Sequence, residues 1–88
     1  MDAATRARLE ALFAPGDREV ASRLLLADFP LAEHPQLCQR IHFAVLKLSA
    51  GRLDELRKWI AEALVDWRDV LVAAEFADST TAHLDWTT

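Results

Sequence analysis

The sequence has little of what marks secreted, disulfide-bonded or membrane proteins. It contains one cysteine, two glycines, three prolines and no tyrosine among its 88 residues. The single cysteine, Cys38, cannot form an internal disulfide, so nothing points to an oxidising compartment. Residues 1–16 carry Arg6 and Arg8 but no apolar stretch after them, which is unlike a signal peptide.

Long apolar runs and an excess of positive charge are also missing. Charged residues such as Lys47, Arg57 and Asp66 interrupt the most apolar segments, so no run approaches the roughly 20 residues that a membrane-spanning helix needs. The formal net charge of -4 at pH 7 opposes general attraction to nucleic acid or to an anionic membrane, because both bind through a positive field. We therefore expect a cytoplasmic protein with no nucleic acid and no membrane among its partners.

The composition that remains is typical of one folded helical domain. Hydrophobic residues make up 52% of the chain and charged residues 27%, which is enough apolar material for one core. Helices are expected over residues 2–13, from Asp17 to a turn at 29–31, over 35–49, from 53 or 54 to about 66, and over 67–77. We predict an all-α, compact bundle of four to five short helices built from antiparallel hairpins. It forms a single domain over residues 1–78, followed by an irregular tail over 79–88.

The segment 35–49 is the best candidate for a central helix. Its inward stripe is expected to contain Leu37, Ile41, Ala44, Val45 and Leu48. Phe43 and Leu46 point to other sides, which a central helix can also bury. The next helix is expected to face inward with Leu56, Ile60, Ala63 and Leu64.

A break is expected near Asp66, although the apolar spacing would allow one long helix to continue. Asp66 and Asp69 resemble a capping box with aspartate in place of the usual glutamate. A carboxylate at a helix start accepts backbone N–H bonds, so capping accounts for both aspartates before any catalytic role does.

Several apolar side chains remain after each helix is given one inward stripe, and they raise the question of a partner. Burial by a neighbouring helix and use in an interface account for them equally well. For Trp86, docking back on the bundle is the commoner outcome. The predicted interface, with Arg68 at its rim, comprises Phe43, Trp59, Arg68, Val72, Phe76 and Trp86.

His34, Cys38 and His42 suggest a metal site, because zinc prefers imidazole and thiolate ligands. At about 1.5 Å of rise per residue, however, His34 and His42 are separated by roughly 12 Å, too far to share one ion. Only a pair could bind, so we expect no cofactor.

His83 and Asp85 form a base and orienter pair in principle, but no nucleophile or catalytic motif accompanies them. A small metal-dependent or acid–base enzyme is thus an alternative.

A helix-turn-helix regulator is a further alternative, because two expected helices meet around Gly51. Asp54 and Glu55 would stand at the start of the recognition helix, where DNA repels negative charge. This alternative would need a basic surface formed by Arg40, Lys47, Arg52, Arg57 and Lys58.

The block AVLKLSAGRLDELRKWI at residues 44–60, followed by DWRDVLVAAEF at residues 66–76, resembles a set of short, uncharacterised bacterial proteins with similar motifs. The likeness covers the second half of the chain. It implies a small helical bacterial protein, and it assigns no functional residue because that family has no established activity. From the apolar side chains left over after each helix is given one inward stripe, we expect a non-enzymatic interaction module that binds a protein partner or forms a homodimer through an apolar helix face.

Overall fold

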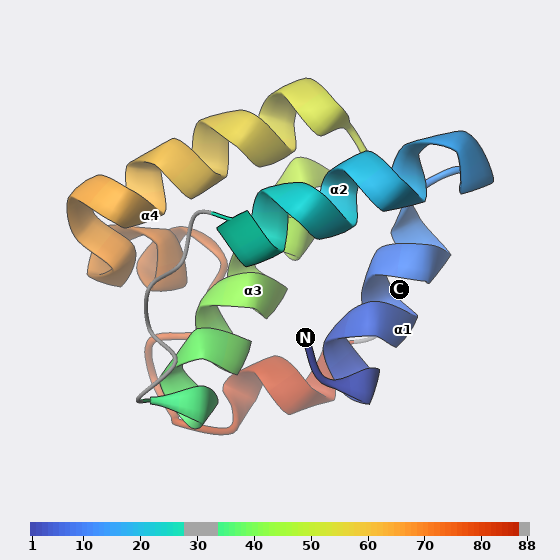
Figure 1. Cartoon of the computed structure of the whole chain (residues 1–88). Coiled ribbons are helices and arrows are strands. Elements are labelled where there is room, and N and C mark those ends of the chain that lie inside the picture. The colour runs from blue at the N-terminus through green and yellow to red at the C-terminus, as the bar shows by residue number, and fades with distance from the viewer. Residues whose placement is uncertain (28–33, 87–88) are drawn as a thin grey trace.

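The computed structural model describes residues 1–27 and 34–86, and within them the chain is helical (Figure 1). The elements are α1 (Ala3–Leu12), α2 (Pro15–Ala27), α3 (Pro35–Ser49), α4 (Leu53–Ala73) and the 3₁₀ helix η1 (Ala82–Asp85). The all-α prediction is confirmed, and four helices form the compact bundle. The expected turn at 29–31 lies outside the described residues.

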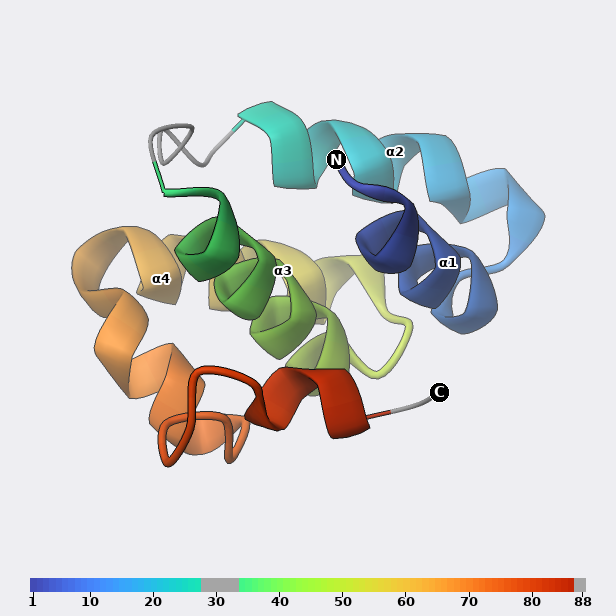
Figure 2. The same ribbon diagram turned by 90° about the horizontal axis from the view of Figure 1, so that it is seen from below.

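α3 is the central helix, as its sequence predicts. It contacts α1, α4 and η1, and Figure 2 shows it between α1 and α2 on one side and η1 on the other. Every residue from Ile41 to Leu46 is buried, including Phe43 and Leu46, which lie off the expected inward stripe. Six consecutive buried residues span all sides of a helix, so α3 needs cover all round.

α2 begins two residues earlier than the expected N-cap at Asp17. Its first residue is Pro15, and Asp17 lies in the first turn. Proline suits this position because its fixed φ is helical and its missing N–H would have had no partner in the helix. Proline therefore starts the second helix as well as ending the first.

The expected break near Asp66 is present as a bend inside α4. Asp66 has φ -153° and ψ 97°, which are not helical values. Its Oδ1 accepts a hydrogen bond from the backbone N–H of Arg68 at 3.0 Å, so the carboxylate caps the second part of the helix. The bend lets Val70, Leu71 and Ala74 reach the core after the helix has changed direction.

Leu64 was expected to face inward and does not. Its exposed fraction is 53%, whereas Leu56, Ile60 and Ala63 are buried. Leu64 lies at the edge of the stripe that these three residues define and directly before the bend. The inward side of α4 is therefore narrower than the apolar spacing indicates.

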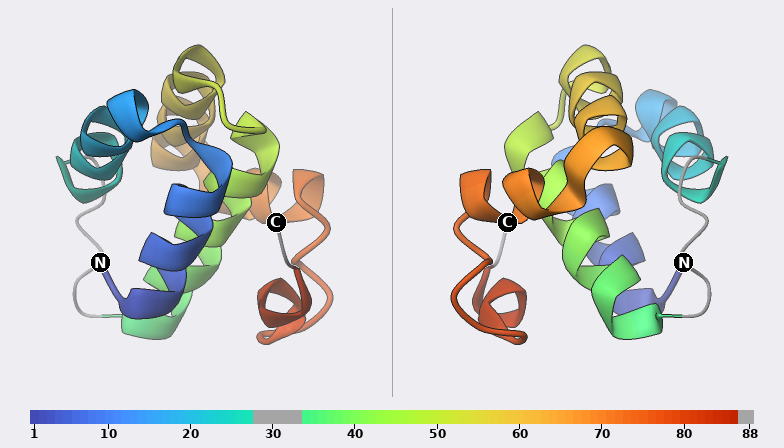
Figure 3. Two further views of the ribbon diagram at one scale, coloured as in Figure 1. Left: turned by 90° about the vertical axis from the view of Figure 1, so that its right-hand side faces the viewer. Right: turned by 90° about the vertical axis from the view of Figure 1, so that its left-hand side faces the viewer.

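The tail, expected to be irregular, contains η1 and packs on the bundle. Figure 3 places η1 on the side of α3 away from α2. His83 is buried, and Trp86 is half-buried against the core. The tail thus completes the cover of α3, because its aromatic side chains occupy the side that no full helix covers.

Gly51 has a structural role that alanine cannot fill. Its φ is +82°, and a Cβ placed on it would lie 2.5 Å from the main-chain oxygen of Leu12. We expect Gly51→Ala to lower the free energy of unfolding by about 2 kcal/mol or more, because it adds left-handed strain and a backbone clash. Urea unfolding followed by circular dichroism measures this. The matched control is Gly16→Ala, where a Cβ meets nothing within 4 Å. Equal losses in the two variants would contradict this account.

The cap at Asp66 is open to a similar test. Removing the carboxylate in Asp66→Ala should lower the free energy of unfolding by about 1 kcal/mol, because the N–H of Arg68 loses its acceptor. Asp66→Asn keeps an acceptor oxygen and should retain most of the stability. Chemical denaturation of both variants distinguishes loss of the hydrogen bond from other effects of the substitution on stability. The capping role is wrong if asparagine is as harmful as alanine.

Candidate functional site

The largest exposed apolar side chains concentrate on α4. The five large hydrophobic residues most exposed among those described are Leu26, Leu64, Val65, Val72 and Leu84. Three of these five fall within residues 64–72, and the exposed fractions of Val65 and Val72 are 85% and 63%. We call Leu64, Val65, Arg68 and Val72 the outer surface of α4. Apolar exposure gathered on one helix, unlike scattered exposure, is typical of a binding surface.

Two residues of this surface were missed by the reasoning from sequence. Leu64 was assigned to the core, and Val65 was assigned no role. A helical projection contains the signal for Val65, because at 100° per residue it lies nearly opposite the buried stripe of Leu56, Ile60 and Ala63. The sequence contains no such signal for Leu64. It lies at the edge of the buried stripe, and its exposure depends on the bend that follows.

The six predicted interface residues divide into three groups. Arg68 and Val72 are exposed, Trp59 and Trp86 are half-buried against the core, and Phe43 and Phe76 are buried within the chain. The exposed fractions of Phe43 and Phe76 are 0% and 3%, so neither can contact a partner while the tail is in place. Their cover comes from the tail, whose position the sequence pattern does not indicate.

Phe43 and Phe76 form an aromatic cluster with His83 and Trp86. The His83 ring meets Phe43 edge to face at 5.0 Å between centroids, and Trp86 lies 6.1 Å from the same ring. Both tail rings also lie 6.3 Å from Phe76. Aromatic pairs in such tilted arrangements each contribute about 1 kcal/mol beyond their buried area.

A chain of polar contacts joins the two ends of the protein through α3. His83 Nε2 lies 2.7 Å from Gln39 Oε1, and Gln39 Nε2 donates to Asp2 Oδ2 at 2.9 Å. Asp2 also caps α1 by accepting the N–H of Thr5. Burial raises the pKa of Asp2, but hydrogen bonds from Thr5 and Gln39 bring it below its ordinary 3.8. The carboxylate is thus charged and holds Gln39 with its amide oxygen toward His83.

Arg8 completes the surface on which the tail lies. Its guanidinium stacks over the Phe43 ring at 4.4 Å, and its Nε donates to the main-chain oxygen of Trp86 at 3.2 Å. We call Arg8, Gln39, Phe43 and Phe76 the tail-docking surface. It combines two aromatic faces, a cation and an amide, and thus recognises both the side chains and the backbone of the tail.

The environment of His83 favours its neutral form. Burial lowers the pKa of His83 below its ordinary 6.5, and the positive charges of Arg40 and Arg8 lower it further. His83 Nδ1 is buried without a hydrogen-bond partner among the described residues. The neutral ring therefore carries its proton on Nε2, which donates to Gln39.

His34, Cys38 and His42 do not converge on one point. His34 is exposed before α3, while Cys38 Sγ lies 3.6 Å from His42 Nε2. Burial raises the pKa of the Cys38 thiol above 9.0, so the thiol is neutral at pH 7. Among the described residues, no group of three or more histidine, cysteine or acidic side chains could hold a metal ion. The pair at Cys38 and His42 packs at the edge of the core.

His83 and Asp85 do not form a base and orienter pair. The ring nitrogen of His83 contacts Gln39, and Asp85 is exposed. A histidine that donates to a neutral amide gains no basicity from its partner. His83 therefore anchors the tail.

Most of the basic residues that a nucleic-acid interface would need are engaged within the chain. Arg40 donates to the main-chain oxygens of Phe76 and Ser79, and Lys47 donates to that of Ala74. These contacts satisfy carbonyls at and beyond the end of α4, where positive charge is favourable.

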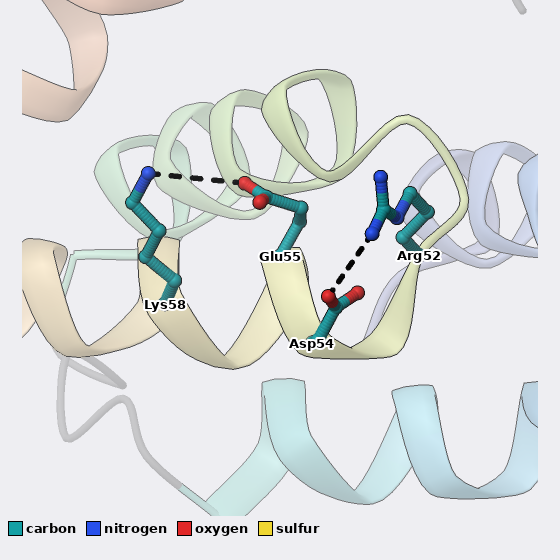
Figure 4. Close-up of polar contacts among 4 residues, drawn as sticks. All are labelled: Arg52, Asp54, Glu55 and Lys58. Atoms are coloured by element: carbon teal, nitrogen blue, oxygen red, sulfur yellow. Dashed lines mark hydrogen bonds and ion pairs between the residues drawn. The ribbon is translucent and has the colours of Figure 1, made fainter.

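The first two turns of α4 carry two ion pairs, as Figure 4 shows. Arg52 meets Asp54 at 3.2 Å, and Lys58 meets Glu55 at 4.0 Å. Both acidic side chains thus stand at the start of the helix that a helix-turn-helix protein would present to DNA. The two ion pairs partly neutralise the basic residues beside them.

Comparisons with protein-family models, with curated proteins and with solved structures found no match. Among the described residues, no helix combines the length and the apolar character needed to cross a membrane.

The pKa shift of His83 predicts how stability depends on pH. Because the folded protein holds this histidine neutral, the unfolded chain binds more protons below pH 6.5. The free energy of unfolding should therefore be greatest above pH 6.5 and fall as the pH drops, by at most about 1.4 kcal/mol per pH unit for this residue. His42, whose pKa is also lowered by burial, adds to the same trend.

Urea unfolding at several pH values tests this prediction. The His83→Gln variant should show a shallower decline than the wild type, because the titrating ring is gone. Gln36→Ala is the control, because it changes an exposed residue that does not titrate and should leave the decline unchanged. If His83→Gln and the wild type lose stability in parallel, burial of His83 is not the cause.

Proposed function

We propose that this protein is a non-enzymatic interaction module that binds another protein through the outer surface of α4. The observation that carries the proposal is the exposure of Val65, 85%, on a helix whose other side is anchored in the core. A valine exposed to this extent gains little from burial on folding, whereas its burial by a partner would gain about 1.5 kcal/mol.

The geometry of α4 supports this use. Leu56, Ile60 and Val70 are buried on both sides of the bend, so the helix is held rigidly against the bundle. A rigid helix face loses little conformational entropy when a partner binds, which favours affinity. The partner surface that fits is apolar.

Arg68 gives this surface a polar rim. Its guanidinium lies 4.8 Å above the ring of Trp67, and both residues follow the bend directly. Arginine and tryptophan are enriched where interfaces derive most of their binding energy. Arg68 and Val72 are also four residues apart within the second part of α4, and so they face the same side.

Neither alternative has comparable support in the described residues. For the enzyme alternative, the Cys38 thiol is neutral and the histidines lie apart. For the nucleic-acid alternative, the basic side chains of Arg40, Lys47 and Arg52 are engaged with carbonyls and carboxylates of the same chain. Neither observation identifies a ligand. The exposed apolar residues of α4 remain the feature that folding itself does not explain.

Site-specific photo-crosslinking tests the proposal without disturbing the core. A photoreactive phenylalanine analogue at position 65 should crosslink to a protein in cells, because Val65 would be buried in the interface. The matched control places the same group at Ala7, which is exposed on α1. Mass spectrometry of the crosslinked band distinguishes a second copy from a different protein, and either result supports the proposal.

A substitution then tests whether the contact contributes to binding. Adding Val72→Asp to the crosslinking protein should abolish the crosslink from position 65, because a desolvated carboxylate opposes an apolar interface. Far-UV circular dichroism checks that folding is intact, as expected for an exposed position. The proposal fails if position 65 crosslinks no more than position 7.

A further inference from the structure

The tail is joined to the bundle by an exposed connection. Residues 77–81 are exposed, and η1, with four residues, is too short to be stable by itself. Phe76 is held on the bundle independently of η1, because its N–H donates to Leu71 and its main-chain oxygen accepts from Arg40 at 3.1 Å. The segment that can leave therefore begins after Phe76, and its docking depends chiefly on the contacts of His83 and Trp86.

His83 is the buried polar side chain of this contact. Only 3% of its surface is exposed, and its two ring nitrogens have different surroundings. Nε2 lies 2.7 Å from Gln39 Oε1, whereas Nδ1 is buried with no hydrogen-bond partner among the described residues. The neutral ring suits this arrangement, because its one N–H donates to Gln39 and Nδ1 carries no hydrogen. A second proton would bind at Nδ1, where the described residues provide no acceptor.

The charged groups around His83 also oppose a positive ring. Burial lowers the pKa of His83, and the guanidinium groups of Arg40 in α3 and Arg8 in α1 lower it further. The carboxylate of Asp2 raises it, but Gln39 lies between the two groups and contacts both. Burial and two positive charges outweigh this one carboxylate, so the docked ring resists a proton.

The other elements near the tail do not reverse this balance. Phe76, which follows α4, presents an aromatic ring to His83, and Asp85 in η1 is exposed, so solvent screens its charge. Burial lowers the pKa of His42 in α3 as well, but His42 interacts with the backbone of Leu25 in α2. Because η1 lies on the side of α3 away from α2, as Figure 3 shows, titration of His42 does not act on the tail directly.

We propose that docking of the tail is a pH-sensitive switch, in which protonation of His83 releases η1 and uncovers Phe43 and Phe76. In the docked tail, the added proton creates a buried N–H at Nδ1 that has no acceptor and stands beside two guanidinium groups. In the released tail, water solvates the same charge. Acid therefore favours the released form, because that form binds the proton more readily.

The direction of the pKa shift sets the pH range of the switch. The released ring regains its ordinary pKa of 6.5, whereas the docked ring has a lower one. Docking is thus at full strength above pH 6.5 and weakens below it, by at most about tenfold per pH unit, until the docked ring is protonated too. Between pH 7.5 and pH 5, the ratio of released to docked protein should rise by up to about 30-fold. The switch does not depend on the proposed function, because the tail-docking surface and the outer surface of α4 share no residue.

Fluorine NMR of protein labelled with 6-fluorotryptophan is the test. The three tryptophans give three resonances, and that of Trp86 is assigned by its loss in Trp86→Phe. As the pH falls from 7.5 to 5, the Trp86 signal should shift toward that of a free peptide of residues 79–86, while those of Trp59 and Trp67 stay in place. A Trp86 signal unchanged at pH 5, or three signals that change together as the whole chain unfolds, would overturn the proposal.

The His83→Gln variant tests the origin of the pH response. Glutamine stays neutral, so the Trp86 signal of this variant should no longer depend on pH. Gln36→Ala is the matched control, because it changes an exposed residue that does not titrate and should keep the wild-type response. If the tail of His83→Gln is still released by acid, another group such as His42 causes the release and the proposal is wrong.

A second variant keeps the proposal testable if the tail of His83→Gln does not dock. Gln39→Glu preserves the size of the side chain and places a carboxylate against Nε2 of His83, which stabilises the positive ring. The ratio of released to docked protein should then rise less between pH 7.5 and pH 5 than it does in the wild type. A rise equal to that of the wild type would also overturn the proposal.

Discussion

The burial of α3 on every side is the constraint on which the rest of the structure depends. Six consecutive residues, Ile41 to Leu46, have almost no exposed surface, so each side of this helix needs a neighbour. α1, α4 and η1 contact it directly, and α2 contacts both α1 and α4. A chain of 88 residues forms few helices that could cover α3. The tail therefore covers the remaining side, and its aromatic side chains become part of the core.

The same constraint explains the bend in α4. A straight helix of 21 residues would carry its second half past the end of α3, leaving Val70 and Leu71 without cover. The bend at Asp66 turns this half back onto the bundle, and the carboxylate of Asp66 compensates for the interrupted helical hydrogen bonds. In turning, the helix leaves Leu64 exposed at the edge of its inward stripe, whereas Val65 already lies opposite that stripe.

The tail cluster shows why two residues of the predicted interface, Phe43 and Phe76, are buried within the chain. Phe43 lies off the inward stripe of α3 and Phe76 follows the end of α4. From sequence, a buried aromatic residue cannot be distinguished from one that contacts a partner. The deciding residues, His83 and Trp86, are 40 and 43 positions beyond Phe43. Helical periodicity relates residues three or four apart, so it contains no information about contacts at that distance. Gln39 and Arg8 were not recognised for the same reason.

The sequence by itself determined the helical class, the central position of α3 and the break at Asp66. These follow from local causes, namely apolar spacing, proline and glycine at helix ends, and a capping carboxylate. The tertiary structure alone decided which leftover apolar residues are covered. It buried Phe43 and Phe76 beneath the tail, exposed Leu64 at the bend, and joined Asp2, Gln39 and His83 through hydrogen bonds. Burial depends on which distant segment reaches a given face, and that is a property of the assembled chain.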